Sequence, residues 1–158
     1  MKTMTKEDFI KRAIEIASQN VAVGGGPFGA IIVKDGEIIA EGVNRVTSNN
    51  DPTAHAEVQA IREACAKLGN FELKGCEIYT SCEPCPMCFS AIYWARLDKV
   101  FFAATHLDAE KVGFDDAFIY REIKLHHQQR SIAFEEINLH EKLMPFRLWT
   151  QKEDKTAY

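Results

Sequence analysis

Two apolar runs joined by an Asp-Gly pair are the feature that most constrains the fold of this chain. The runs FGAIIVK and EIIAEGVN, within residues 28–44, are rich in Ile, Val and Ala and meet at Asp35-Gly36. An Asp-Gly pair between apolar runs is a strong signal for a β-hairpin, because both residues tolerate the left-handed backbone of a type I′ turn. The sequence therefore predicts two antiparallel strands early in the chain.

Three segments carry apolar residues at helical spacing. The first begins at Thr5, which with Asp8 resembles a capping pair. The second is AHAEVQAIREACAKLG, which Gly69 is expected to end. The third, CPMCFSAIYWAR, begins at a pair of cysteines. Each should pack its apolar side against a neighbouring layer.

Short apolar runs alternate with these helices. CEIYTS is typical of a strand, and KVFFAA is typical of a strand buried on both faces. Strands that alternate with helices predict an α/β sandwich, and the opening hairpin makes its sheet a mixed one.

The pattern is weaker in the last third of the chain. DDAFIYREI predicts a short helix and IAFEEIN, residues 132–138, predicts an edge strand. EKLMPFRLWTQKEDK is predicted to be helical in parts, with Pro145 as an interruption. The chain has 158 residues and no repeat or clear linker, so a single domain over residues 1–158 is expected.

Composition narrows the class of function. The formal net charge is −4 and no basic run is present, whereas proteins that grip nucleic acid usually show a basic face. A small or uncharged substrate is therefore favoured. We expect no signal peptide and no membrane span, because no segment has the required apolar core. The odd number of cysteines, five, favours reduced thiols and a cytoplasmic location.

Two short segments carry the candidate chemistry. Cys85 and Cys88 are three residues apart, which places both thiols on one face of a helix's first turn, where thiolates are favoured. His55 opens another helix and can supply a nitrogen ligand. These three ligands would leave one position of a tetrahedral zinc ion open for water. Glu57 is roughly 200° round the helix from His55, so it is expected to move protons rather than to bind the metal.

Each of these two segments, taken alone, is compatible with a different kind of site. A lone His-x-Glu is usually solvated surface, and a lone Cys-x-x-Cys also fits a redox pair or a structural zinc site. A thioredoxin-like context and a second Cys-x-x-Cys are both absent. An iron–sulfur cluster on Cys82, Cys85 and Cys88 would lack its fourth cysteine. Catalytic zinc is therefore favoured, with Cys82 as a small buried residue ahead of Pro84.

The motifs PTAHAEVQAI and TSCEPCPMC…AIYWAR, in this order, resemble those of the cytidine deaminase-like superfamily of zinc-dependent base deaminases. The segments GGGPFGAIIVKDG, NDPTAHAEV and VGFDDAFIY and the C-terminal Tyr look most like the bacterial guanine deaminases. The resemblance covers nearly the whole chain.

The resemblance implies a three-layer α/β/α sandwich with a five-stranded mixed sheet. It also implies one zinc ion per subunit, held by His55, Cys85 and Cys88, with a bound water or hydroxide that attacks C2 of guanine. Glu57 would be the proton shuttle, and the products would be xanthine and ammonia.

Five residues are candidates for binding the substrate. Asn44 ends the second strand and is expected to present its amide to the base, although such an Asn can also stabilise a turn. Phe28 can stack on a purine or belong to the core, and Trp94 can line the pocket or pack its helix. The resemblance assigns Asp116 and Tyr158 to recognition of guanine, although QKEDKTAY by itself is typical of a frayed tail.

The resemblance further implies a homodimer that exchanges its C-terminal segment, about residues 140–158, so that Tyr158 serves its own or the partner's site. The other histidines lack ligand spacing and are interpreted as surface or packing residues: His106, His126, His127 and His140.

Three competing functions remain open. A tRNA adenosine deaminase would be expected to show clustered basic residues. A cytosine or other small-base deaminase would share the zinc machinery and differ in the pocket. A non-catalytic binding module stabilised by zinc would have a closed metal shell and no need of Glu57.

Overall fold

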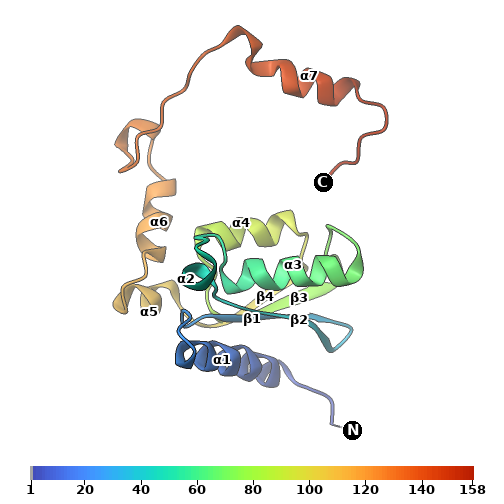
Figure 1. Cartoon of the computed structure of the whole chain (residues 1–158), viewed down its shortest axis with the longest axis vertical. Helices are drawn as coiled ribbons and strands as arrows, with labels where there is room; N and C mark the ends of the chain where they lie inside the picture. Colours follow the sequence, from blue (N-terminus) through green and yellow to red (C-terminus); the bar gives the residue numbers. More distant parts are fainter. Residues whose placement is uncertain (1) are drawn as a thin grey trace. The chain divides into compact units, whose positions relative to one another are not determined.

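A mixed sheet of four strands, in the order β2-β1-β3-β4, forms the centre of the fold (Figure 1). β1 (Gly29–Lys34) pairs antiparallel with β2 (Glu37–Val43) and with β3 (Cys76–Cys82). β3 pairs parallel with β4 (Lys99–Ala104). The predicted α/β class and mixed sheet are thus confirmed.

This computed structural model describes residues 2–158, which divide into two compact units. The first runs to Tyr120 and contains the whole sheet, and the second is Arg121–Tyr158. A single domain with an exchanged C-terminal segment stays a prediction.

The predicted hairpin is confirmed in detail. Lys34 faces Glu37 across the turn, and both residues between them have positive φ, 51° at Asp35 and 79° at Gly36. Two left-handed residues in a two-residue loop define the type I′ turn that matches the twist of the strands.

Helices cover both faces of the sheet, as predicted for a three-layer sandwich (Figure 1). α1 (Lys6–Ala22) lies on one face, where Ile31 and Val33 of β1 pack with Phe9. α3 (Ala56–Leu68) and α4 (Pro86–Trp94) lie on the other face, where the alternate strand residues, including Ile32, belong to a second core cluster. The period of two along β1 divides the core between the two helical layers.

Close packing of β2 on α3 fixes the position of the first turn of that helix. A Cβ atom added to Gly42 would lie 2.2 Å from the carbonyl oxygen of Ala56 and 2.5 Å from the nitrogen of Ala60. Any larger residue would push α3 away from the sheet. The N-terminus of α3, and with it His55, is therefore held directly against β2.

The helix boundaries follow their local signals. Thr5 and Asp8 form the predicted capping box before α1, and Gly69 ends α3 in a left-handed conformation with φ 62°. Three short helices, α2 (Val46–Asn49), α5 (His106–Lys111) and α6 (Asp116–Ile123), complete the connections. The connection between β2 and α3 thus contains a helical turn.

The second unit is built from α7 (Met144–Gln151) and two 3-10 turns, His127–Gln129 and His140–Leu143. Pro145 lies in the first turn of α7, where its missing N–H needs no partner, so it opens the helix. The prediction that Pro145 interrupts a helix is wrong for this reason. Throughout Arg121–Tyr158 the residues are exposed or half-buried.

Three expectations about the sheet are wrong. The described residues form four strands, not five, and all four lie between residues 29 and 104. Residues 132–138 are not a strand, because they pair with none of these four. β4 is an edge strand rather than a fully buried one, and its Phe102 is 46% exposed. An apolar composition does not reveal whether an edge strand has layers on both of its faces.

Within residues 2–158, no helix combines the length and the apolar character that crossing a bilayer requires.

Candidate metal centre and substrate pocket

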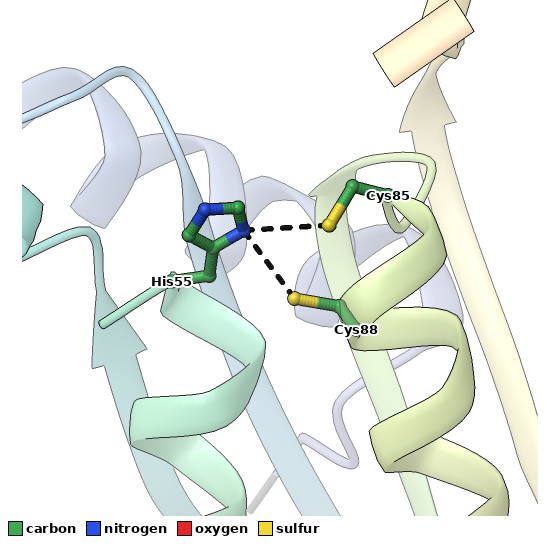
Figure 2. Close-up of side chains that lie close together, drawn as sticks. All are labelled: His55, Cys85 and Cys88. Carbon is green, nitrogen blue, oxygen red and sulfur yellow. Dashed lines mark hydrogen bonds between the residues drawn. The ribbon is translucent and has the colours of Figure 1, made fainter. Parts of the chain in front are cut away.

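The three predicted metal ligands converge at one end of the sheet (Figure 2). The Nδ1 atom of His55 lies 3.4 Å from the Sγ atom of Cys85 and 3.5 Å from that of Cys88. Among the described residues, these form the one group of three or more His, Cys, Asp or Glu whose ligand atoms all lie within 4.8 Å of one another. Side chains from two separate helices thus point at a common centre.

Helix N-termini position all three side chains. His55 is the N-cap residue of α3, with extended backbone angles, so its ring projects from the helix end. Cys85 is the N-cap residue of α4, Pro86 begins that helix, and Cys88 lies in its first turn. Proline suits the first helical position, and the N-terminal end of a helix dipole favours negatively charged ligands.

The donor set fits zinc. One imidazole nitrogen and two thiolate sulfurs are ligands that zinc prefers, and three protein ligands leave one coordination position open. A structural zinc site would require a fourth protein ligand. The arrangement therefore matches the kind of site that zinc enzymes use for catalysis.

The hydrogen bond between the two thiols of the site shifts their pKa values in opposite directions. The hydrogen bond with Cys88 and that with His55 lower the pKa of Cys85 to about 4, against the effect of burial. The same hydrogen bond and burial raise the pKa of Cys88. A metal binds both sulfurs as thiolates, so metal binding is coupled to pH.

Glu57 lies in the first turn of α3, beside the metal ligands and not among them. It is 7% exposed, and burial raises the pKa of its carboxyl group, although a hydrogen bond with Cys88 acts in the opposite direction. A buried carboxyl group next to a metal site is suited to accept and donate protons.

A cavity of 590 Å³ opens over this centre. Its lining includes six of the predicted site residues: Phe28, Asn44, His55, Glu57, Cys85 and Asp116. The cavity is large enough for a small planar ligand.

Asn44 and Phe28 lie on one side of the cavity. The Oδ1 atom of Asn44 accepts a hydrogen bond from the Val46 N–H at 3.1 Å, so its amide NH₂ is the group that can donate to a ligand. Asn20 fixes this wall from behind, because its side-chain amide donates to the carbonyl oxygens of Gly26 and Asn44, each at 2.9 Å. The Asn44 side chain is therefore held as a donor.

Phe114 and Glu83 also line the cavity, and the sequence did not indicate either of them. The Phe114 ring meets that of Phe28 edge to face, with centroids 4.8 Å apart. Phe114 directly precedes the Asp-Asp pair of VGFDDAFIY, and that pair was the sequence feature that could have indicated Phe114 as a site residue. Glu83 directly precedes the Pro-Cys motif, and no spacing rule marks it.

Asp116 begins α6 and faces the same cavity. Burial raises the pKa of its carboxyl group, and the nearby Cys85 adds to that effect. Its carboxyl group is a hydrogen-bond acceptor when ionised.

Trp94 and Tyr158 are not among the residues that line this cavity. Trp94 is the last residue of α4 and is 61% exposed, with the Arg96 guanidinium 5.9 Å from its ring. Tyr158 ends the second unit, where its ring is 6.5 Å from that of Trp149. The pocket role predicted for Trp94 therefore has no support here, and the role of Tyr158 stays a prediction.

Cys82 and the remaining histidines lie outside the metal group. Cys82 ends β3, is 8% exposed and donates its thiol to the Thr105 carbonyl oxygen at 3.5 Å. Burial raises the pKa of this thiol to about 12, as suits a packing residue. Among the histidines, His106 contacts Glu83 and packs near Tyr120.

Comparison with known proteins defines the class first. The family model for the cytidine and deoxycytidylate deaminase zinc-binding region matches residues 3–104, which is more than half of the chain. The chain therefore belongs to this family of zinc-binding deaminases, and zinc is the metal that its His/Cys/Cys group is built to hold.

Relatives within the family are more specific. The chain is 57% identical over 156 residues to the guanine deaminase of Bacillus subtilis (strain 168), in a match that covers 98% of this chain and 100% of the relative. The X-ray structure of guanine deaminase from Bacillus subtilis matches with a TM-score of 0.95 over 98% of this chain and 99% of the other. A tRNA-specific adenosine deaminase of Aquifex aeolicus (strain VF5) is 46% identical over 126 residues, 79% of this chain and 82% of the relative.

Proposed function

We propose that this chain is a zinc-dependent guanine deaminase, which hydrolyses guanine to xanthine and ammonia. The observation that carries the proposal is the cavity in which a His/Cys/Cys group, a buried carboxyl group and two aromatic rings lie together. Full-length similarity to the Bacillus subtilis guanine deaminase supports the choice of guanine. That similarity includes the segment after β4, which the family model does not reach.

His55, Cys85 and Cys88 are the residues that would hold zinc. When bound, zinc supplies a Lewis acid that lowers the pKa of water enough to give a nucleophile at neutral pH. The N-termini of α3 and α4 face this position, so their dipoles stabilise negative charge there.

Glu57 is the proton carrier in this proposal. Hydrolysis at C2 of guanine adds the oxygen of water and releases the amino group as ammonia, so protons must pass from water to the ring and to the leaving nitrogen. Glu57 is buried beside the ligands and lines the cavity, so it can reach both the attacking water and the base. Its carboxyl group takes the proton from the attacking water and returns protons to a ring nitrogen and to the leaving amine.

The other wall of the cavity recognises the base. Phe28 and Phe114 offer apolar ring surface for a purine. Asn44 offers an amide donor for an acceptor such as the guanine carbonyl oxygen. Asp116 offers an acceptor for a ring or exocyclic N–H of guanine.

The functional form in this proposal is a homodimer that exchanges its C-terminal segment, with Tyr158 as a further contact to guanine. The second unit supports it, because no residue of Arg121–Tyr158 is buried although the unit is rich in large apolar residues. Exposed examples are Ile132, Phe134, Ile137, Leu139, Phe146 and Leu148. Apolar residues in such numbers favour burial against another surface.

Mixed dimers test the exchange. A Glu57→Gln chain and a chain that lacks Tyr158 are each expected to be impaired, and both should retain zinc. If Tyr158 serves the partner's site, co-expression of the two chains creates one intact site and restores part of the turnover. A mixed dimer no more active than its parents, or a monomer in light scattering, would refute the exchange.

A tRNA adenosine deaminase is the alternative that a specific observation favours, because the Aquifex aeolicus relative shares 46% identity. The match to that relative covers less of the chain than the match to the guanine deaminase does. The net charge of −4 is also unfavourable for a protein that must bind an anticodon loop. A cytosine deaminase and a non-catalytic zinc module have no such support, and a cytoplasmic location stays a prediction.

Ammonia release from a substrate panel tests the proposed activity. The purified zinc-loaded protein is incubated separately with guanine, adenine, cytosine, cytidine and a tRNA anticodon stem-loop. Guanine is expected to give ammonia and xanthine at the highest kcat/KM. Ammonia from the stem-loop and none from guanine would replace the proposal with the alternative, and no ammonia from any substrate would favour a binding module.

A further inference from the structure

The connection that carries Cys85 is fastened to the end of β4. The Glu83 N–H donates to the carbonyl oxygen of Ala104 at 2.7 Å, which continues the parallel pairing of Cys82 with Ala104. Two residues later the chain supplies a metal ligand. The position of Cys85 therefore depends on contacts made just beyond β4.

His106 holds the side chain of Glu83. One carboxylate oxygen of Glu83 accepts a hydrogen bond from the His106 backbone N–H at 3.0 Å and another from its ring Nδ1 atom at 2.5 Å. Both side chains are about one third exposed or less. The first residue of α5 is thus tied to the residue that precedes Pro84.

Tyr120 holds the next residue. Its hydroxyl donates to the carbonyl oxygen of Pro84 at 2.6 Å, and its ring lies 5.1 Å from that of His106. The Pro84 carbonyl belongs to the peptide bond that leads into Cys85. Tyr120 also lies four residues after Asp116 in α6, so the two side chains share one face of that helix.

We propose that Tyr120 and the Glu83–His106 pair are positioning residues. They join the wall that carries Asp116 to the loop that carries Cys85, and so fix the position of the substrate-recognising group relative to the metal centre. The proposal rests on the proposed function for its substrate but not for its geometry. Neither Tyr120 nor His106 lines the cavity. His106 contacts Glu83, which lines it, and Tyr120 contacts Pro84, which lies between the lining residues Glu83 and Cys85. A shift of about 1 Å in a positioning group can cost up to about 10²-fold in rate, so one hydrogen bond can matter here.

Tyr120→Phe is the main test, because it removes one hydroxyl and keeps the ring beside His106. We expect kcat/KM for guanine to fall about tenfold, mainly through a higher KM, as befits a displaced Asp116. Release of zinc to excess chelator should become several-fold faster, because the peptide bond before Cys85 loses its anchor. Tyr93→Phe is the matched control, since Tyr93 is 65% exposed and lies outside the cavity.

A double-mutant cycle separates positioning from a general structural effect. If Tyr120 acts through Asp116, Tyr120→Phe should change kcat/KM less than about twofold in an Asp116→Asn background. Equal effects in both backgrounds would overturn the proposal. Unchanged KM and zinc release in Tyr120→Phe itself would overturn it as well.

His106 gives a second and independent test. His106→Ala should raise KM and hasten zinc release, whereas in His106→Asn the amide can replace the ring Nδ1 atom and restore both. Equal impairment of the two variants would contradict the positioning role of the Glu83–His106 pair. Zinc release needs no substrate, so this readout still decides the proposal if the wild-type protein does not deaminate guanine, in which case the proposed function alone has failed.

Discussion

The two walls of the cavity are built from different kinds of structure. On the metal wall, His55, Glu57, Cys85 and Cys88 all lie in or just before the first turn of a helix that packs on the sheet. On the recognition wall, Phe28, Asn44 and Phe114 lie in connecting segments, and Asp116 begins a short helix. Under the proposed function, rigid elements therefore hold the reacting groups, whereas loops hold the groups that would select the substrate.

The largest effect is expected from breaking the metal wall. Cys85→Ser removes one of two sulfur ligands and leaves the N-cap position of α4 otherwise filled. Zinc content, measured by atomic absorption after dialysis, should fall close to zero, and deamination should be lost with it. A Cys85→Ser protein that keeps stoichiometric zinc would show that another ligand completes the site.

Glu57→Gln should separate chemistry from metal binding on the same wall. The amide keeps the size of the side chain but cannot carry the proton, so kcat should fall by about 10²–10⁴-fold. Zinc content should be unchanged, because Glu57 is outside the ligand group. Loss of zinc from a folded Glu57→Gln protein would make Glu57 a ligand and invalidate its assigned role.

Asp116→Asn addresses the recognition wall. A hydrogen bond to a charged group contributes about 1.5–3 kcal/mol, so its removal should lower kcat/KM for guanine by about 10- to 10²-fold. Steady-state kinetics and zinc content measured on the same preparation check this. If zinc were lost too, the two walls would not be separable in the way that their structures suggest.

The smallest effect is expected at Cys82, which is three residues from a ligand and outside the metal group. Cys82→Ser is matched to Cys85→Ser in chemistry and should leave zinc content unchanged. Thermal unfolding should show a stability change of about 1 kcal/mol or less, because a hydroxyl can also donate to the Thr105 carbonyl oxygen. Loss of zinc from the Cys82→Ser protein would indicate that Cys82 binds the metal together with Cys85 and Cys88.

The metal wall could be predicted from the sequence because helix geometry fixes it. A spacing of three residues places Cys85 and Cys88 together in any helix, and a His-x-Glu at a helix start separates His55 from Glu57. The recognition wall has no such periodic rule. Phe114 and Glu83 were missed because their place in the cavity depends on how β4, α5 and α6 pack beside the sheet. No local sequence pattern encodes that packing.

The errors in the fold have the same origin. The composition of KVFFAA is that of a covered strand, but coverage is a property of the neighbouring layers and not of the strand itself. Residues 132–138 were predicted as an edge strand from a short apolar-rich run, yet a strand also requires an adjacent edge with which to pair. Trp94 was a candidate through its distance along the chain from Cys88; it is not among the residues that line the cavity, and its role stays a prediction.

The order of elements along the chain has a consequence for engineering. The metal ligands and Glu57 all precede β4, within the segment that the family model matches, whereas Phe114 and Asp116 follow it. Residues 105–120 are therefore a segment suited to grafting. Its His106 and Tyr120 make the hydrogen bonds to Glu83 and Pro84 that attach it to the loop before Cys85. Grafts that keep those two contacts are expected to change the part of substrate recognition that Phe114 and Asp116 would supply, and to leave the His/Cys/Cys group intact.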